Sequence, residues 1–143
     1  MPSIYLSPST QEYNLYYDGH GSEEYYMNQI ADAMAPYLTA SGIEFTRNTP
    51  EMTAASSIRA SNEGNYDAHI ALHSNAAPVN LSGQLRGTDV YYYPDSLRSE
   101  EIAQTIASVS YTHLRKQAND SKKSCRRWVD ICGKSAISTN ILR

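Results

Sequence analysis

Lysine is missing from the first three-quarters of this 143-residue chain. Residues 1–107 contain four Arg, thirteen Asp and Glu and no Lys, which gives a net charge of −9. Residues 108–143 contain four Lys, four Arg and two acidic residues, a net charge of +6. The total of −3 therefore hides an acidic domain followed by a basic tail.

Cysteine and long apolar runs are also scarce. The two cysteines, Cys125 and Cys132, do not suffice for a disulfide framework. No apolar run reaches the length of a membrane span, so we expect no membrane partner. The N-terminus, MPSIYLSPST, lacks the basic start and apolar middle of a secretion signal, so we expect synthesis in the cytoplasm without a signal peptide.

The aromatic residues are unevenly distributed among types. One Phe and one Trp stand against twelve Tyr. Tyrosine combines an apolar ring with a polar tip, which suits contact with carbohydrate or peptide and equally suits half-buried packing. Composition leaves both readings open.

Short patterned segments predict an α/β fold. The strands are expected at 3–7, 43–47, 67–74 and 87–94, and the helices at about 23–41, 53–65 and 99–108. This order, β-α-β-α-β-β-α, predicts a three-layer sandwich with a mixed, mostly parallel sheet flanked by helices.

Helix ends are marked by capping residues. Ser22 is expected to cap the first helix, with Glu23 and Glu24 in its first turn. Pro36 is expected to kink or end that helix. Ser99 is expected to cap the third helix.

Three side chains are candidates for a metal site. His20 and Glu24 follow the first predicted strand, and His73 ends the third. In a parallel sheet these positions meet at one edge. Two imidazoles and a carboxylate match the three protein ligands of a catalytic zinc, although by spacing alone His20 also reads as an exposed loop residue and Glu24 as a residue of the helix start.

The segment HSNA at 73–76 follows a strand and precedes a G…RG…VYYYP segment. Thr46-Arg47, Ser61-Asn62 and an E-x-x-x-N pattern formed by Glu24 and Asn28 come before it in order. Over about residues 3–107 this ordered set resembles the zinc-dependent N-acetylmuramoyl-L-alanine amidases of the amidase-3 type. The resemblance implies Zn²⁺ as cofactor, with His73 and Glu24 as ligands, and cleavage of the amide between N-acetylmuramic acid and L-alanine in peptidoglycan.

Two departures from the family pattern stand out. Thr10 in SPST occupies the position of the family's first ligand, a His, so we expect His20 in DGHG to supply that imidazole. The family's general-base Glu, near the end of the domain, has no counterpart after Ala107. The catalytic base of this chain is therefore unassigned, and a non-catalytic peptidoglycan-binding module is the alternative function.

Other polar residues have supporting roles in this interpretation. Ser74 and Asn75 are candidates for binding substrate, and Gln11 and Asn14 for lining the cleft. His69 is a rival ligand that we expect to pack instead, because it lies farther from the strand end. The enzyme would act on the cell wall, as an autolysin or a phage endolysin.

The basic tail is interpreted as a segment of doubtful origin. VSYTHLRK resembles translated adapter sequence of the kind that contaminates assembled reads, which divides the chain into an incomplete amidase-like domain, 1–107, and a tail, 108–143. The alternative is a basic arm that binds nucleic acid or anionic wall polymers. We favour the first interpretation and expect no nucleic-acid partner.

Overall fold

The computed structural model describes residues 1–16, 19–75, 80, 87–94, 96–114, 124–127 and 136–142. The chain divides into two compact units, Met1–His73 and Ser74–Arg143. Ala76 of the HSNA motif and Arg86 of the following segment lie outside the described residues. In the described part of the chain, no helix is both long and apolar enough to cross a bilayer.

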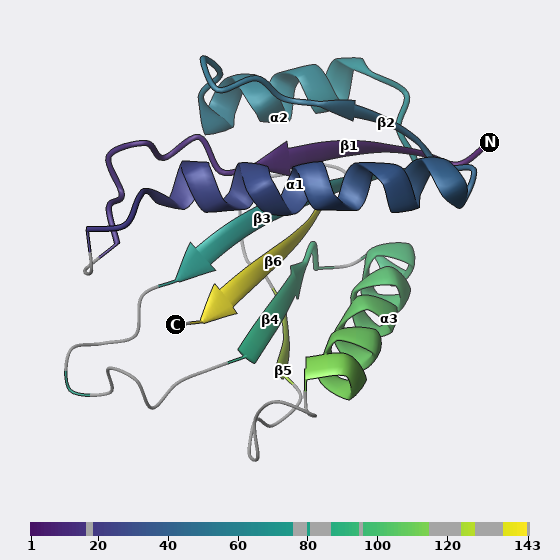
Figure 1. The fold of residues 1–143 in the computed structure, drawn as a ribbon. Helices are drawn as coiled ribbons and strands as arrows, with labels where there is room; N and C mark the ends of the chain where they lie inside the picture. Colours follow the sequence, from purple (N-terminus) through teal and green to yellow (C-terminus); the bar gives the residue numbers. More distant parts are fainter. Residues whose placement is uncertain are drawn as a thin grey trace. The chain divides into compact units, whose positions relative to one another are not determined.

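The first unit alternates strands and helices (Figure 1). Its elements are β1 (Ser3–Pro8), α1 (Glu23–Ala40), β2 (Glu44–Arg47), α2 (Ala54–Glu63) and β3 (Ala68–Asn75), of which β3 runs to the unit boundary and two residues beyond it. β1 pairs in parallel with both β2 and β3, so that Tyr5 lies level with Thr46 and His69. The order β2-β1-β3 follows from two crossover connections, each carried by a helix.

Both faces of β1 are covered. Every residue from Ile4 to Pro8 is buried, although alternate side chains of a strand point to opposite faces. The Tyr5 hydroxyl contacts Sδ of Met52, which lies just before α2, at 3.8 Å. α1 packs on β1 and β2 and buries Met27 and Ala31. The predicted α/β class, with helix, sheet and helix in layers, is confirmed.

The second unit centres on β4 (Gly87–Tyr92). This strand pairs in parallel with β5 (Ser124–Arg127) and antiparallel with β6 (Ala136–Leu142). α3 (Leu97–Leu114) packs against β4, and Val90 and Ala103 form a fully buried core between them. With β1, β2 and β3 parallel and β6 antiparallel to β4, the sheet strands are mixed and mostly parallel, as expected.

Regular structure continues into the basic tail. α3 runs through Ala107 to Leu114, and both β5 and β6 lie within residues 108–143. Strands of four and seven residues are too short to establish a periodic pattern in a sequence. The origin of the tail remains a hypothesis.

The observed α1, Glu23–Ala40, agrees at both ends with the expected 23–41. Ser22 caps the helix, and Glu23 and Glu24 lie in its first turn, as expected. Pro36 does not end the helix, which continues to Ala40. The chain turns only at Gly42, which has φ +68°, a conformation that glycine adopts without strain.

The cap expected for α3 was placed one turn too late. Ser99 lies inside α3 and is fully buried. Its backbone N–H and its hydroxyl both donate to the Ser96 hydroxyl, at 3.3 and 2.9 Å. Ser96 is therefore the residue that satisfies the free N–H groups at this helix start.

Candidate active site

The candidate site lies where β1 and β3 end and α1 begins. Beyond Pro8, the last residue of β1, the Ser9 N–H donates to the Leu72 carbonyl of β3 at 2.9 Å. His73 is the next residue on β3. Proteins with parallel sheets bind their ligands at this edge, beyond the carboxyl ends of the strands.

Glu23 is the first residue of α1 and is only 2% exposed. Its N–H donates to the Asn14 carbonyl at 2.9 Å, which fixes the entry to the helix. Ser22 completes the cap by accepting a hydrogen bond from the Tyr25 N–H at 3.2 Å. The helix N-terminus favours a negative charge at this position.

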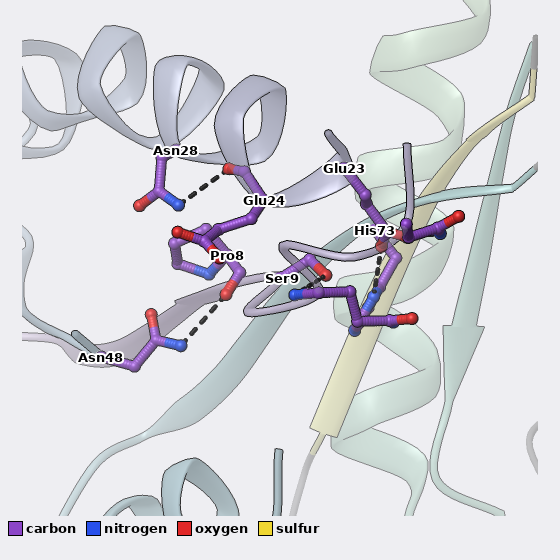
Figure 2. A network of polar contacts seen from close by, with 9 residues as sticks. Pro8, Ser9, Glu23, Glu24, Asn28, Asn48 and His73 are labelled. Atoms are coloured by element: carbon purple, nitrogen blue, oxygen red, sulfur yellow. Dashed lines mark hydrogen bonds and ion pairs between the residues drawn. The ribbon is translucent and has the colours of Figure 1, made fainter. Parts of the chain in front are cut away.

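Each oxygen of the Glu23 carboxylate has a partner. Figure 2 shows the contact with His73. The Asn14 side-chain amide donates to Oε2 at 2.5 Å, and Oε1 lies 2.9 Å from Nδ1 of His73. A buried carboxylate is costly unless it is paired, so these contacts explain how Glu23 is accommodated. The site therefore contains a carboxylate and an imidazole in direct contact.

The structure brings His73 together with Glu23 and not with the neighbouring Glu24. The Glu24 side chain points away from His73 in Figure 2, and its backbone carbonyl accepts a 2.8 Å hydrogen bond from Asn28. His20 is exposed, and its carbonyl accepts a hydrogen bond from the Tyr26 hydroxyl at 2.9 Å. Among the described residues, no three His, Cys, Asp or Glu side chains are grouped so that they would hold a metal ion.

The remaining predicted site residues lie on β3 or just after β1. Ser74 is buried and Asn75 half-buried, and they are the last two residues of β3. Thr10, at the family's first-ligand position, is half-buried and follows Ser9. The roles of Ser74 and Asn75 in binding substrate stay predictions.

His69 packs in the sheet layer, as its distance from the strand end predicted. Its ring lies against Tyr5, with ring centroids 5.3 Å apart. Burial, and then the neighbouring His73, lower the pKa of His69 from 6.5 to about 4. His69 is therefore neutral at pH 7.

A hydrogen-bonded clamp holds the first turns of α1 to the end of β2. Arg47 donates to the side-chain oxygen of Asn28 at 2.6 Å and to its backbone carbonyl at 3.1 Å, and it also pairs with Asp32. Asn28 also donates to the Glu24 carbonyl, so Arg47 is linked through Asn28 to the first turn of α1. The TR and E-x-x-x-N motifs are thus physically joined.

Reasoning from the sequence missed Glu23 as a site residue. The E-x-x-x-N spacing selected Glu24, and Glu23 was assigned only to the helix start. The feature that would have identified Glu23 is its partner, Asn14, which we expected only to line the cleft. Asn14 pairs with Glu23 through both its backbone carbonyl and its side-chain amide. Gln11, the other cleft candidate, donates its N–H to the Ser9 hydroxyl at 3.3 Å.

The sequence profile of the N-acetylmuramoyl-L-alanine amidase family of the amidase-3 type matches residues 12–139. The chain belongs to this family. The match includes Glu23, His73 and most of the basic tail. The enzyme class is accordingly that of peptidoglycan amidases, hydrolases that act on an amide bond of the cell wall. A search of curated proteins found no match.

Solved amidase structures share the fold at low sequence identity. An N-acetylmuramoyl-L-alanine amidase from Clostridium difficile 630 is 15% identical with a TM-score of 0.79, covering 96% of this chain and 77% of that one. The catalytic domain of CwlV from Bacillus (Paenibacillus) polymyxa var. colistinus is 10% identical with a TM-score of 0.76, covering 99% and 81%. AmiC2 of Nostoc punctiforme is 14% identical with a TM-score of 0.75, covering 96% and 77%.

Amidases of this family are generally zinc-dependent, and the donor set suits zinc in part. Glu23 offers a carboxylate oxygen and His73 an imidazole nitrogen, both of which are zinc ligands. In this structure Oε1 of Glu23 and Nδ1 of His73 are in direct contact at 2.9 Å, and on binding a metal each would turn toward it. The pair fits two of the three protein positions of a catalytic site.

Proposed function

We propose that this amidase hydrolyses the bond between N-acetylmuramic acid and L-alanine in peptidoglycan, at a zinc centre that includes Glu23 and His73. The observation that carries the proposal is the buried carboxylate in contact with an imidazole at the sheet edge where ligands bind. Family membership supplies the substrate class.

The ligand set that we propose differs from the first expectation at one position. Glu23 takes the place of Glu24, because it is Glu23 whose carboxylate contacts His73. His20 remains the predicted third ligand, since it lies in the loop that joins Asn14 to Glu23. Bound zinc would polarise the substrate carbonyl and lower the pKa of its water to about 7.

The neighbouring residues of this chain hold the Glu23 carboxylate in position. Asn14 holds Oε2 of Glu23, so that Oε1 stays turned toward His73. The helix N-terminus favours the ionised form of Glu23, and its burial keeps bulk water from competing for the carboxylate.

The binding module is a second candidate function, because a general base is missing from the expected region. Residues 108–143 contain Asp120 and Asp130 but no Glu. Loss of a general base lowers the rate by about a hundredfold or more. A chain that holds zinc and peptidoglycan without a base would bind the wall and cut it slowly.

Release of new L-alanine amino termini from purified peptidoglycan tests the proposal. We expect release by the full chain, its loss on zinc chelation and recovery with added zinc. His73→Ala should lose it, whereas Gln29→Ala, an exposed control on α1, should not. Release that survives both chelation and His73→Ala would contradict the proposal. Zinc-dependent retention on peptidoglycan without release would select the binding module.

A further inference from the structure

The peptide group that joins Pro8 to Ser9 is held on both of its sides. Its carbonyl oxygen, on Pro8, accepts a hydrogen bond from the side-chain amide of Asn48 at 3.0 Å (Figure 2). Its N–H, on Ser9, donates to the Leu72 carbonyl of β3 at 2.9 Å. A peptide group is planar, so a bond that fixes its oxygen also fixes the direction of its N–H. Asn48 and Leu72 are therefore linked through one rigid unit.

Asn48 follows directly on β2, which ends at Arg47, and takes over the pairing with β1. The Asn48 backbone N–H donates to the Leu6 carbonyl at 3.2 Å. Its side chain then reaches the Pro8 carbonyl, two residues farther along β1. One residue thus satisfies two carbonyls of β1, the second of them with a side-chain donor where β2 has ended.

This link is buried. Asn48 is 6% exposed and Ser9 2%, and Pro8 is fully buried. The amide nitrogen of Asn48 also donates to the hydroxyl of Ser57, a buried residue of α2, at 3.3 Å. A buried carbonyl that loses its donor is left unpaired, which costs more than the bond itself contributes. Water is therefore a poor replacement for the Asn48 amide.

The link ends at the candidate active site. The Leu72 carbonyl belongs to the peptide group that joins Leu72 to His73, so the bond from Ser9 fixes the backbone from which the His73 side chain projects. Nδ1 of His73 lies 2.9 Å from Oε1 of Glu23. A shift of the β3 backbone by a few tenths of an ångström changes this contact, because hydrogen bonds occupy a narrow range of distances.

We propose that Asn48 is a positioning residue of the active site, which sets the position of His73 relative to Glu23 through the Pro8–Ser9 peptide group. Asn48 supports the imidazole of the pair as Asn14 supports the carboxylate. The inference rests on the proposed function and deepens it, because a zinc centre needs its ligands directed at one point by the groups around them.

Two measurements on the zinc-free protein test the link. In Asn48→Ala, hydrogen exchange at the Ser9 amide should be about fivefold faster. The Asp67 amide, which donates to the Ser3 carbonyl at the other end of β1, should keep its rate. A purely structural loss speeds exchange at both amides. The nitrogen NMR resonance of His73 Nδ1 should also shift, because its hydrogen bond changes.

Ser57→Ala is the matched control. It removes the other partner of the Asn48 amide, also buried, and leaves the bond to Pro8 in place. Neither the Ser9 exchange rate nor the His73 resonance should change in this variant. Asn48→Leu keeps about the same side-chain volume without a donor, and it should reproduce the result if Asn48→Ala does not fold.

Zinc affinity connects the link to the proposed function. Asn48→Ala should bind zinc about tenfold more weakly than the wild type, and Ser57→Ala as tightly as the wild type. A wild type that binds no zinc, or that binds zinc and releases no amino termini, would refute the proposed hydrolysis. The measurements on the zinc-free protein still decide the role of Asn48 in that case, so the two claims fail separately.

Three outcomes would overturn the inference. One is equal acceleration of exchange at Ser9 and Asp67 in Asn48→Ala. Another is a His73 resonance that does not shift in that variant. The third is zinc binding that Asn48→Ala and Ser57→Ala weaken to the same extent.

Discussion

Glu23 and His73 are 50 residues apart in the sequence, yet Oε1 of one lies 2.9 Å from Nδ1 of the other. One comes from the first turn of α1 and the other from the end of β3. The contact joins a helix start to a strand end, and the fold must form before the pair exists. Any chemistry that depends on this pair is therefore sensitive to what holds α1 in position.

Arg47→Ala tests the clamp between β2 and α1. The change removes two hydrogen bonds to Asn28, and bonds from charged donors are each worth about 1.5–3 kcal/mol. We expect the free energy of unfolding to fall by about 2 kcal/mol in urea denaturation. Asp32→Ala is the matched control: its carboxylate also pairs with Arg47 but is 70% exposed, so it should cost less than about 1 kcal/mol. Equal losses in the two variants would contradict this ranking.

Gly21→Ala tests how closely the loop backbone packs on the rings of Tyr25 and Tyr26. Gly21 has φ +131°, and an added Cβ would lie 3.2 Å from ring atoms of both Tyr25 and Tyr26. Gly19→Ala is the control, since its φ of +72° also disfavours a side chain but an added Cβ would meet no atom within 4 Å. Backbone strain alone costs about 1–2 kcal/mol. The close contact with the two rings adds to this cost at Gly21, so the unfolding temperature should fall more for Gly21→Ala than for Gly19→Ala. A larger loss for Gly19→Ala would refute the packing argument.

His69 makes stability depend on pH. Its pKa of about 4 in the folded protein lies below the ordinary value of 6.5, because burial and His73 disfavour the charged ring. Between these values the unfolded chain binds a proton that the folded chain does not, so stability falls as the pH falls from 6.5 toward 4. The loss over the whole window is about 3 kcal/mol.

Urea denaturation at pH 7 and pH 4.5, in wild type and His69→Gln, measures this contribution. The wild type should lose more stability than the variant between the two pH values, since glutamine does not titrate. Parallel losses in the two proteins would show that other groups carry the acid sensitivity.

Local signals predicted the fold well. Ser22 and Gly42 mark the ends of α1 through hydrogen bonds and backbone angles that involve only their near neighbours. The cap of α3 was misplaced because Ser96 and Ser99 are both capping residues, three positions apart. Which of them lies outside the helix depends on how α3 packs, since packing is what buries Ser99.

The site was less predictable for the same reason. Glu23 and Glu24 are chemically identical and adjacent, and only the direction of α1 relative to β3 decides which carboxylate turns inward. That direction is set by contacts distant in sequence, such as Arg47 with Asn28. His73 was predictable because it lies near the end of a strand, and the carboxyl ends of parallel strands form the edge of the sheet where ligands bind.

The zinc content of purified wild type, Glu23→Gln and Glu24→Gln tests the central claim most directly. The two variants make the same chemical change at neighbouring positions, so their net charge is matched, and urea denaturation checks that both are folded. The account predicts about one zinc per chain in the wild type and in Glu24→Gln. It predicts little zinc in Glu23→Gln, because a catalytic zinc site needs all three of its protein ligands. Zinc retained by Glu23→Gln and lost from Glu24→Gln would contradict it.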